Sequence, residues 1–258
     1  MNQIDDTLNR LVQKGKTPSV QYLLFDQDKI LHEYRGGFAD VANQKKANEE
    51  TTYNAFSVTK TFTALAILQL AEKGKIDIDK SAANYMDNFP YSGDITVRHL
   101  LTHTAGIPNP NPLSRIHPTN EHQVFDRDAA EGKWQPFKPY YINGASYGGI
   151  IGRPVSFMKY AQDLLKKDGM LISPEYKQML FTENLTLDHK STSMCLSWFT
   201  DQLNDLSYFA HAGGGGGYYC EVRLYPDAGI GSVIMFNRSG MSNEKYLDKL
   251  DLIYFKQH

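Results

Sequence analysis

Residues 57–74 constrain the fold more than any other part of the chain, because they form a helical stretch that is apolar on nearly every side. The apolar side chains follow one another without a continuous polar stripe: Phe62, Leu65, Ala66, Ile67, Leu68, Leu70 and Ala71. A helix of this kind offers no face to water and must be covered by other elements. Ser57 marks its start and Lys73-Gly74 its end. The sequence therefore predicts a buried central helix with the rest of the chain packed around it.

Strand patterns lie towards both ends of the chain. Near the N-terminus, apolar runs at residues 20–25 and 30–35 flank a turn, and Gly36-Gly37 is expected to end the second run. Near the C-terminus, alternating runs at 218–225 and 230–237 flank a Pro-Asp-Ala-Gly turn, which predicts a hairpin. Shorter helices are predicted over residues 5–14, 156–167 and 242–256.

This order of elements predicts an α+β fold, in which N- and C-terminal strands form one antiparallel sheet flanked by helices. A single domain is expected over residues 1–258, with a sheet part at 1–56 and 190–258 and a helical part at 57–189. Residues 104–143 are rich in Pro and are expected to be irregular, and so long an irregular stretch usually has a function.

Composition excludes several classes of protein. The 27 basic and 29 acidic residues give a net charge of -2 without a basic block, which argues against a nucleic-acid partner. No run approaches 18 apolar residues, so no membrane span is predicted. The polar, acidic N-terminus differs from a signal peptide, so we expect a cytoplasmic protein as the sequence is written, or a periplasmic or secreted one if a leader was removed. Two cysteines, Cys195 and Cys220, are too few for a disulfide framework and are expected to be free thiols.

Ser57 and Lys60 carry the first chemical signal. Residues three apart lie on one face of a helix, so the amine can reach the hydroxyl and help to deprotonate it. Ser57 also lies at a helix N-terminus, where backbone N–H groups favour a developing oxyanion. The same spacing occurs at Ser156/Lys159 and Ser242/Lys245, where we expect capping serines and solvated lysines.

Two further segments carry polar or conformationally unusual residues. His99 and His103 have the spacing of a helical metal pair, but no glutamate lies between them, so a structural role beneath the site is favoured. His211 precedes five glycines that lead into a strand. Glycines allow close backbone approach, and their N–H groups could face an anion or a carbonyl oxygen; the alternative is a flexible entry into the hairpin.

Together these segments resemble the serine β-lactamase and penicillin-binding-protein superfamily, in particular its class C β-lactamase-like branch, which includes family VIII esterases and D-amino-acid peptidases. Ser57-Val58-Thr59-Lys60 resembles the Ser-x-x-Lys motif, and the segment from Ile95 to Pro108 resembles a recurring family sequence. Ser197-Trp198-Phe199 resembles the tryptophan-containing strand, and His211-Ala212-Gly213 stands in place of Lys-Thr-Gly. The matches follow the family order.

The resemblance implies a β-lactamase/transpeptidase-like fold and an acyl-enzyme mechanism without a cofactor or metal. Ser57 would attack an ester or amide carbonyl and Lys60 would help to take its proton. The N–H groups of Ser57 and Gly214 would form the oxyanion hole, and His211 and Gly213 would lie on the strand edge along which the substrate binds.

The family's Tyr-x-Asn motif has a literal match at Tyr141-Ile142-Asn143, which would supply a catalytic tyrosine and a substrate-binding asparagine. The residues from Asn143 to Gly152 instead resemble a later Gly-Gly segment of the family, and the interval to His211 is short. Two hypotheses follow. In the first, Tyr141 or its neighbour Tyr140 takes the position of the family's tyrosine. In the second, which we favour, the helical insert is shortened and Ser57 is poorly activated.

The main hypothesis is a serine hydrolase that cleaves small esters or D-amino-acid-type amides, with weak β-lactam hydrolysis. The alternative is a catalytically impaired homologue that binds a peptide or cell-wall fragment, or self-associates as a homo-oligomer through apolar surface uncovered by the reduced insert. A metal-dependent hydrolase that uses His99 and His103 is the least favoured reading.

Overall fold

The computed structural model describes residues 2–108, 116–118, 124–127, 134–137, 140–142, 144–186, 188–239, 241 and 245–257. Its main element is a seven-stranded sheet in the order β10-β11-β12-β13-β1-β2-β3, with every neighbouring pair antiparallel. The strands are β1 (Ser19–Asp26), β2 (Ile30–Asp40), β3 (Lys45–Lys46), β10 (Phe199–Leu203), β11 (Leu206–Gly215), β12 (Tyr218–Tyr225) and β13 (Ile230–Phe236).

The two ends of the chain meet in the middle of this sheet. β1 pairs with β13 from Val20↔Phe236 to Asp26↔Ile230. The predicted C-terminal hairpin is β12–β13, and its turn contains Gly229 in the left-handed region at φ 65°. The predicted α+β fold with an antiparallel sheet flanked by helices is therefore confirmed.

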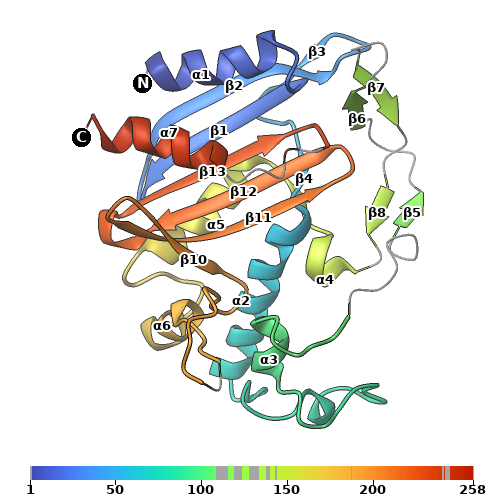
Figure 1. The fold of residues 1–258 in the computed structure, drawn as a ribbon, viewed down its shortest axis with the longest axis vertical. Helices are drawn as coiled ribbons and strands as arrows, with labels where there is room; N and C mark the ends of the chain where they lie inside the picture. The colour runs from blue at the N-terminus through green and yellow to red at the C-terminus, as the bar shows by residue number, and fades with distance from the viewer. Residues whose placement is uncertain are drawn as a thin grey trace.

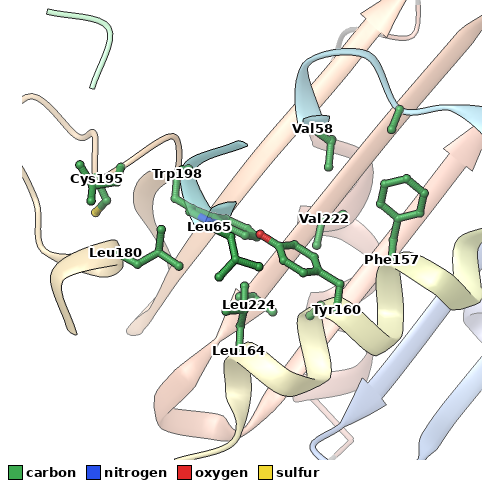
Figure 2. Close-up of a cluster of buried hydrophobic side chains, with 14 of the residues drawn as sticks. Val58, Leu65, Phe157, Tyr160, Leu164, Leu180, Cys195, Trp198, Val222 and Leu224 are labelled. Carbon is green, nitrogen blue, oxygen red and sulfur yellow. The ribbon is translucent and has the colours of Figure 1, made fainter. Parts of the chain in front are cut away.

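Helices cover both faces of the sheet (Figure 1). On one face lie α1 (Asn2–Gln13) and α7 (Lys245–Phe255), and on the other lie α2 (Thr59–Glu72) and α5 (Pro154–Leu165). Alternate residues of β12 face the two layers: Val222 and Leu224 belong to the core beneath α2 and α5, whereas Tyr219 and Tyr225 belong to the core beneath α1 and α7. Figure 2 shows the first of these cores, in which Leu65 of α2 and Tyr160 of α5 lie close to Trp198.

The predicted central helix begins two residues later than expected. A short 3-10 turn, η1 (Phe56–Val58), contains Ser57, and α2 starts at Thr59. Five of its side chains are buried: Thr59, Thr61, Ala64, Leu65 and Leu68. Leu70 is 40% exposed, so the helix is central but not covered on every side.

β2 runs through Gly36 and Gly37, so the prediction that these glycines end the strand is wrong. Gly37 has φ 85°, and a Cβ there would lie 2.0 Å from the carbonyl oxygen of Pro18. The glycines therefore let β2 continue past the start of β1, where a side chain would collide with the neighbouring backbone.

The remaining elements are short. β4 (Tyr53–Asn54) pairs with β9 (Ile151–Gly152), β5 (Ile116–Pro118) with β8 (Tyr140–Ile142), and β6 (Val124–Arg127) with β7 (Trp134–Phe137). The stretch 104–143, predicted to be irregular, thus contains four short strands. The remaining helical elements are η2 (Ala82–Asn84), α3 (Val97–Leu101), α4 (Ala145–Gly148), α6 (Pro174–Phe181) and η4 (Pro226–Ala228). Among the helices of the described residues, none combines the length and hydropathy needed to cross a bilayer.

Candidate active site

Ser57 and Lys60 meet at the start of α2. The ammonium nitrogen of Lys60 donates a hydrogen bond to Ser57 Oγ over 2.8 Å, and both residues are partly buried. The equally spaced Ser156 and Lys159 are both exposed on α5. Ser156 lies within that helix rather than at its cap, which is Arg153, so its predicted capping role is wrong. Ser242 and the side chain of Lys245 lie outside the described residues.

A sharp turn between β4 and α2 presents Ser57. Phe56 has φ 43°, a conformation that bulky side chains rarely adopt. Two hydrogen bonds hold the turn: Phe56 N–H donates to Asn54 Oδ1 over 2.8 Å, and Ala55 N–H donates to the Ile150 carbonyl over 2.9 Å. Backbone strain of this kind persists only where surrounding contacts impose it, and it clusters at functional sites.

Lys60 has a second acceptor on α4. Its Nζ donates to the carbonyl oxygen of Tyr147 over 3.1 Å and lies 5.7 Å from the centre of the Tyr147 ring. The ring packs against Gly144, where a Cβ would lie 1.9 Å from a ring carbon. Two acceptors on different elements restrict the Lys60 side chain to a narrow range of positions beside Ser57.

The glycines of β11 bring this strand against the turn that carries Ser57. A Cβ on Gly213 would lie 2.0 Å from the Ala55 carbonyl oxygen and 2.7 Å from the Ser57 amide nitrogen. A Cβ on Gly215 would lie 2.4 Å from the Phe56 ring. Gly214 faces the other way, towards Tyr219. Glycine therefore serves close packing of β11 on the turn, and the alternative of a merely flexible hairpin entry is wrong because residues 206–215 are one continuous strand.

His211 lies on the same strand and is only 3% exposed. Its Nδ1 is 2.7 Å from the Ala212 carbonyl oxygen, and its Nε2 is buried without a hydrogen-bond partner among the described residues. Burial, with a smaller contribution from Lys60 and His103, lowers the pKa of His211 to about 4, against the opposing effect of the Ala212 hydrogen bond. His211 is therefore a neutral imidazole near neutral pH.

His99 has a structural role at the start of α3. Its Nδ1 accepts a hydrogen bond from Thr96 N–H over 3.2 Å, and its own N–H donates to Thr96 Oγ1 over 3.1 Å, which closes a capping box on α3. α3 ends at Leu101, and His103 has φ 57° beyond the helix, so the two histidines do not share one helical face. Among the described residues there is no cluster of three or more metal-ligating side chains.

The proposed Tyr-x-Asn motif is described only in its backbone. Tyr141 lies on β8, opposite His117 of β5, and Asn143 lies outside the described residues. Tyr147 was not singled out from the sequence, although its carbonyl is an acceptor for Lys60. The sequence offers no signal for this role, because a backbone carbonyl can come from any residue type.

Comparison with known proteins shows which family and which folds the chain resembles. The Beta-lactamase family model matches residues 4–127. Protein flp of Staphylococcus aureus (strain NCTC 8325 / PS 47) is 35% identical over 112 residues, which make up 42% of this chain and 22% of that protein. The match thus spans about a fifth of this curated relative.

Solved structures share the fold at low sequence identity. The octameric penicillin-binding protein homologue from Pyrococcus abyssi has a TM-score of 0.84 and 17% identity, covering 99% of this chain and 77% of that one. The D-amino acid amidase from Ochrobactrum anthropi SV3 has a TM-score of 0.74 and 15% identity, with 99% of each chain covered. The Beta-lactamase family model thus matches the N-terminal part of the chain, and the solved structures show that the chain shares the fold of a penicillin-binding protein homologue and a D-amino acid amidase.

Proposed function

We propose that the protein is a serine hydrolase that forms an acyl-enzyme on Ser57. The observation that carries the proposal is the 2.8 Å hydrogen bond between Lys60 Nζ and Ser57 Oγ at the start of a buried helix. In its neutral form Lys60 takes the Ser57 proton as Oγ attacks the carbonyl carbon of an ester or amide. The leaving group then takes a proton, and water releases the acyl group from Ser57 in a second step.

The negative charge that develops on the carbonyl oxygen needs hydrogen-bond donors. Ser57 N–H lies at the N-terminal end of the helical segment, and β11 packs closely against it through Gly213. The N–H groups of Ser57 and Gly214 are the donors that we assign to this oxyanion hole. Removal of one such donor typically lowers kcat by about 10²–10³-fold.

We place small esters and D-amino-acid-type amides first among the substrates and β-lactams behind them. The fold shared with a D-amino acid amidase supports the amides. The ranking of β-lactams follows from His211, because a neutral imidazole in place of a lysine lacks the positive charge that holds a β-lactam carboxylate. Tyr141 and Asn143 stay in the proposal as the second proton carrier and a substrate ligand.

Covalent labelling tests the nucleophile directly. The wild-type protein would be incubated separately with a fluorophosphonate probe and a penicillin, and the intact mass would be measured. Ser57→Ala removes the proposed nucleophile, and Ser156→Ala is the matched control because Ser156 has a lysine at the same spacing but is exposed. We expect an adduct on the wild type and on Ser156→Ala, and none on Ser57→Ala.

Two outcomes would overturn the proposal. An adduct that persists on Ser57→Ala would place the nucleophile elsewhere. No adduct on the wild type with either reagent would mean that the fold persists without an activated serine, and the binding-module alternative would take its place.

We also propose that the protein associates with itself to form a homo-oligomer. It is supported by the fold shared with a penicillin-binding protein homologue whose structure is octameric. Light scattering on the purified protein tests it, and a monomer over the micromolar range would contradict it.

A further inference from the structure

The hydrogen bond of His211 fixes which of its two nitrogens carries the proton. Nδ1 lies 2.7 Å from the Ala212 carbonyl oxygen, and a carbonyl oxygen can only accept. Nδ1 therefore holds the hydrogen. Because the ring is neutral near neutral pH, Nε2 carries a bare lone pair, which makes it an acceptor and not a donor.

This lone pair is buried and has no partner among the described residues. Buried polar atoms without a partner are rare in folded proteins, and each one calls for an explanation such as an absent ligand. His211 is two residues from Gly213 on β11, and residues two apart on a strand point to the same face. The His211 side chain therefore lies on the face of β11 that packs on the Ser57 turn.

The surroundings of His211 define what could meet Nε2. The groups that act on it electrostatically, apart from Ala212, are Lys60 and His103. The Phe199 ring lies edge-on to the imidazole at 5.4 Å between centres and is itself 46% exposed. Lys60 disfavours a second positive charge beside this acceptor, which favours a neutral donor over a cation. His103 adds little positive charge near neutral pH, because burial and Lys60 lower its pKa.

We propose that Nε2 of His211 accepts a hydrogen bond from a neutral N–H on the acyl part of the substrate, so that the site selects N-acylated amino-acid esters and amides. The proposal rests on the acyl-enzyme function assigned above and deepens it by naming the acyl group. A carboxylate at this position is rejected because it would face a lone pair and not an N–H.

Matched esters test the hydrogen bond. We would measure kcat/KM for the p-nitrophenyl esters of N-acetyl-D-alanine and of its N-methyl analogue, which lacks the N–H. In the wild type we expect a preference for the N–H ester of about tenfold, the usual range for one neutral hydrogen bond. In His211→Phe the ratio of kcat/KM for the two esters should fall to the ratio of their intrinsic reactivities. His211→Gln keeps an acceptor oxygen and should restore part of the preference for the N–H ester.

The comparison between variants removes any intrinsic difference between the two esters, as in a double-mutant cycle. His189→Gln is the control for a histidine substitution, because His189 is exposed in the loop between α6 and β10. Circular dichroism would show that His211→Phe and His211→Gln are folded. An equal N–H preference in the wild type and in both His211 variants would overturn the proposal and leave the acyl-enzyme function standing.

If Ser57 is not labelled and neither ester is cleaved, the proposed acyl-enzyme function has failed. A second measurement tests the hydrogen bond to His211 even in that case. In ¹⁵N NMR spectra of the imidazole, N-acetyl-D-alaninamide should shift the lone-pair signal of His211 Nε2, whereas the analogue methylated at the acylated nitrogen should not. Identical responses to the two amides, or a spectrum in which Nε2 carries the proton, would overturn the proposal.

Discussion

Lys60 Nζ lies 2.8 Å from Ser57 Oγ and 3.1 Å from the carbonyl oxygen of Tyr147, so one amine joins the start of α2 to α4. The Tyr147 carbonyl orients the amine without taking its place as a base, because a backbone oxygen does not titrate. Ser57 therefore has a hydrogen-bond partner whose position is set by two separate elements.

Lys60→Met is expected to slow the labelling of Ser57 by a fluorophosphonate by about 10²–10⁴-fold, the usual contribution of a positioned acid–base group. Methionine keeps much of the length and apolar stem of lysine but provides no lone pair or N–H at Nζ. The measurement is a time course of adduct formation by intact mass. Lys159→Met is the control, since Lys159 is exposed and pairs in sequence with an exposed serine; equal rates for the two variants would contradict the assigned role of Lys60.

Gly213→Ala is expected to lower the labelling rate by at least about tenfold and to destabilise the protein. Its Cβ would lie 2.0 Å from the Ala55 carbonyl oxygen and 2.7 Å from the Ser57 amide nitrogen. Both atoms are backbone, so β11 and the Ser57 turn must separate, which shifts the nucleophile relative to its oxyanion donors. The labelling rate and the thermal unfolding would be compared with those of Gly93→Ala, where the added methyl meets nothing within 4 Å. Equal labelling rates and equal stabilities of the two variants would contradict the close packing of β11 on the Ser57 turn.

The parts of the fold that the sequence predicts are those governed by local pattern. The β12–β13 hairpin follows from alternation around a turn, and its Gly229 has the positive φ that such turns need. The existence of α2 follows from its apolar composition, although the structure leaves Leu70 of this helix 40% exposed. The Ser57–Lys60 contact follows from spacing on a helical segment, with burial separating it from Ser156/Lys159.

The parts that escape prediction depend on contacts between distant segments. From the sequence, Gly37 is predicted to end a strand. The strand instead continues, because a glycine at this position fits against the Pro18 carbonyl. The carbonyl of Tyr147 reaches Lys60 only through the placement of α4, and any residue type could supply that atom. Likewise, the neutral state of His211 depends on burial and on Lys60 and His103, which no local pattern around residue 211 reveals.

His99→Ala is expected to lower the free energy of unfolding by about 1 kcal/mol, the usual value for loss of a helix cap. The imidazole Nδ1 accepts from Thr96 N–H at the start of α3, which has only five residues. His99→Gln should recover most of the loss, because a glutamine at this position can accept the same hydrogen bond. Urea unfolding provides the measurement, and a larger loss in His99→Gln than in His99→Ala would exclude the capping role.

Glu221→Gln is expected to change how stability depends on pH. Glu221 is 1% exposed on β12, where its carboxylate accepts from Tyr219 OH over 2.9 Å and from Arg223 Nη2 over 2.7 Å. Burial raises its pKa from 4.5 to about 7, against the opposing effects of Arg223 and Tyr219. The folded protein thus keeps this proton between about pH 5 and 7, whereas the unfolded chain releases it.

Raising the pH through this window therefore favours unfolding, and the stabilisation present below pH 4.5 is lost as pH rises through about 7. The glutamine cannot titrate. As the pH rises through this range, the free energy of unfolding of the variant should therefore increase relative to that of the wild type by up to about 1 kcal/mol per pH unit, which corresponds to roughly 2–4 °C in Tm. Thermal unfolding of both proteins at pH 5, 6, 7 and 8 gives this difference directly and cancels the titration of all other groups. Glu49→Gln, at an exposed glutamate, is the control; a difference between wild type and Glu221→Gln that stays constant with pH would show that Glu221 is ionised throughout and that Arg223 offsets the cost of its burial.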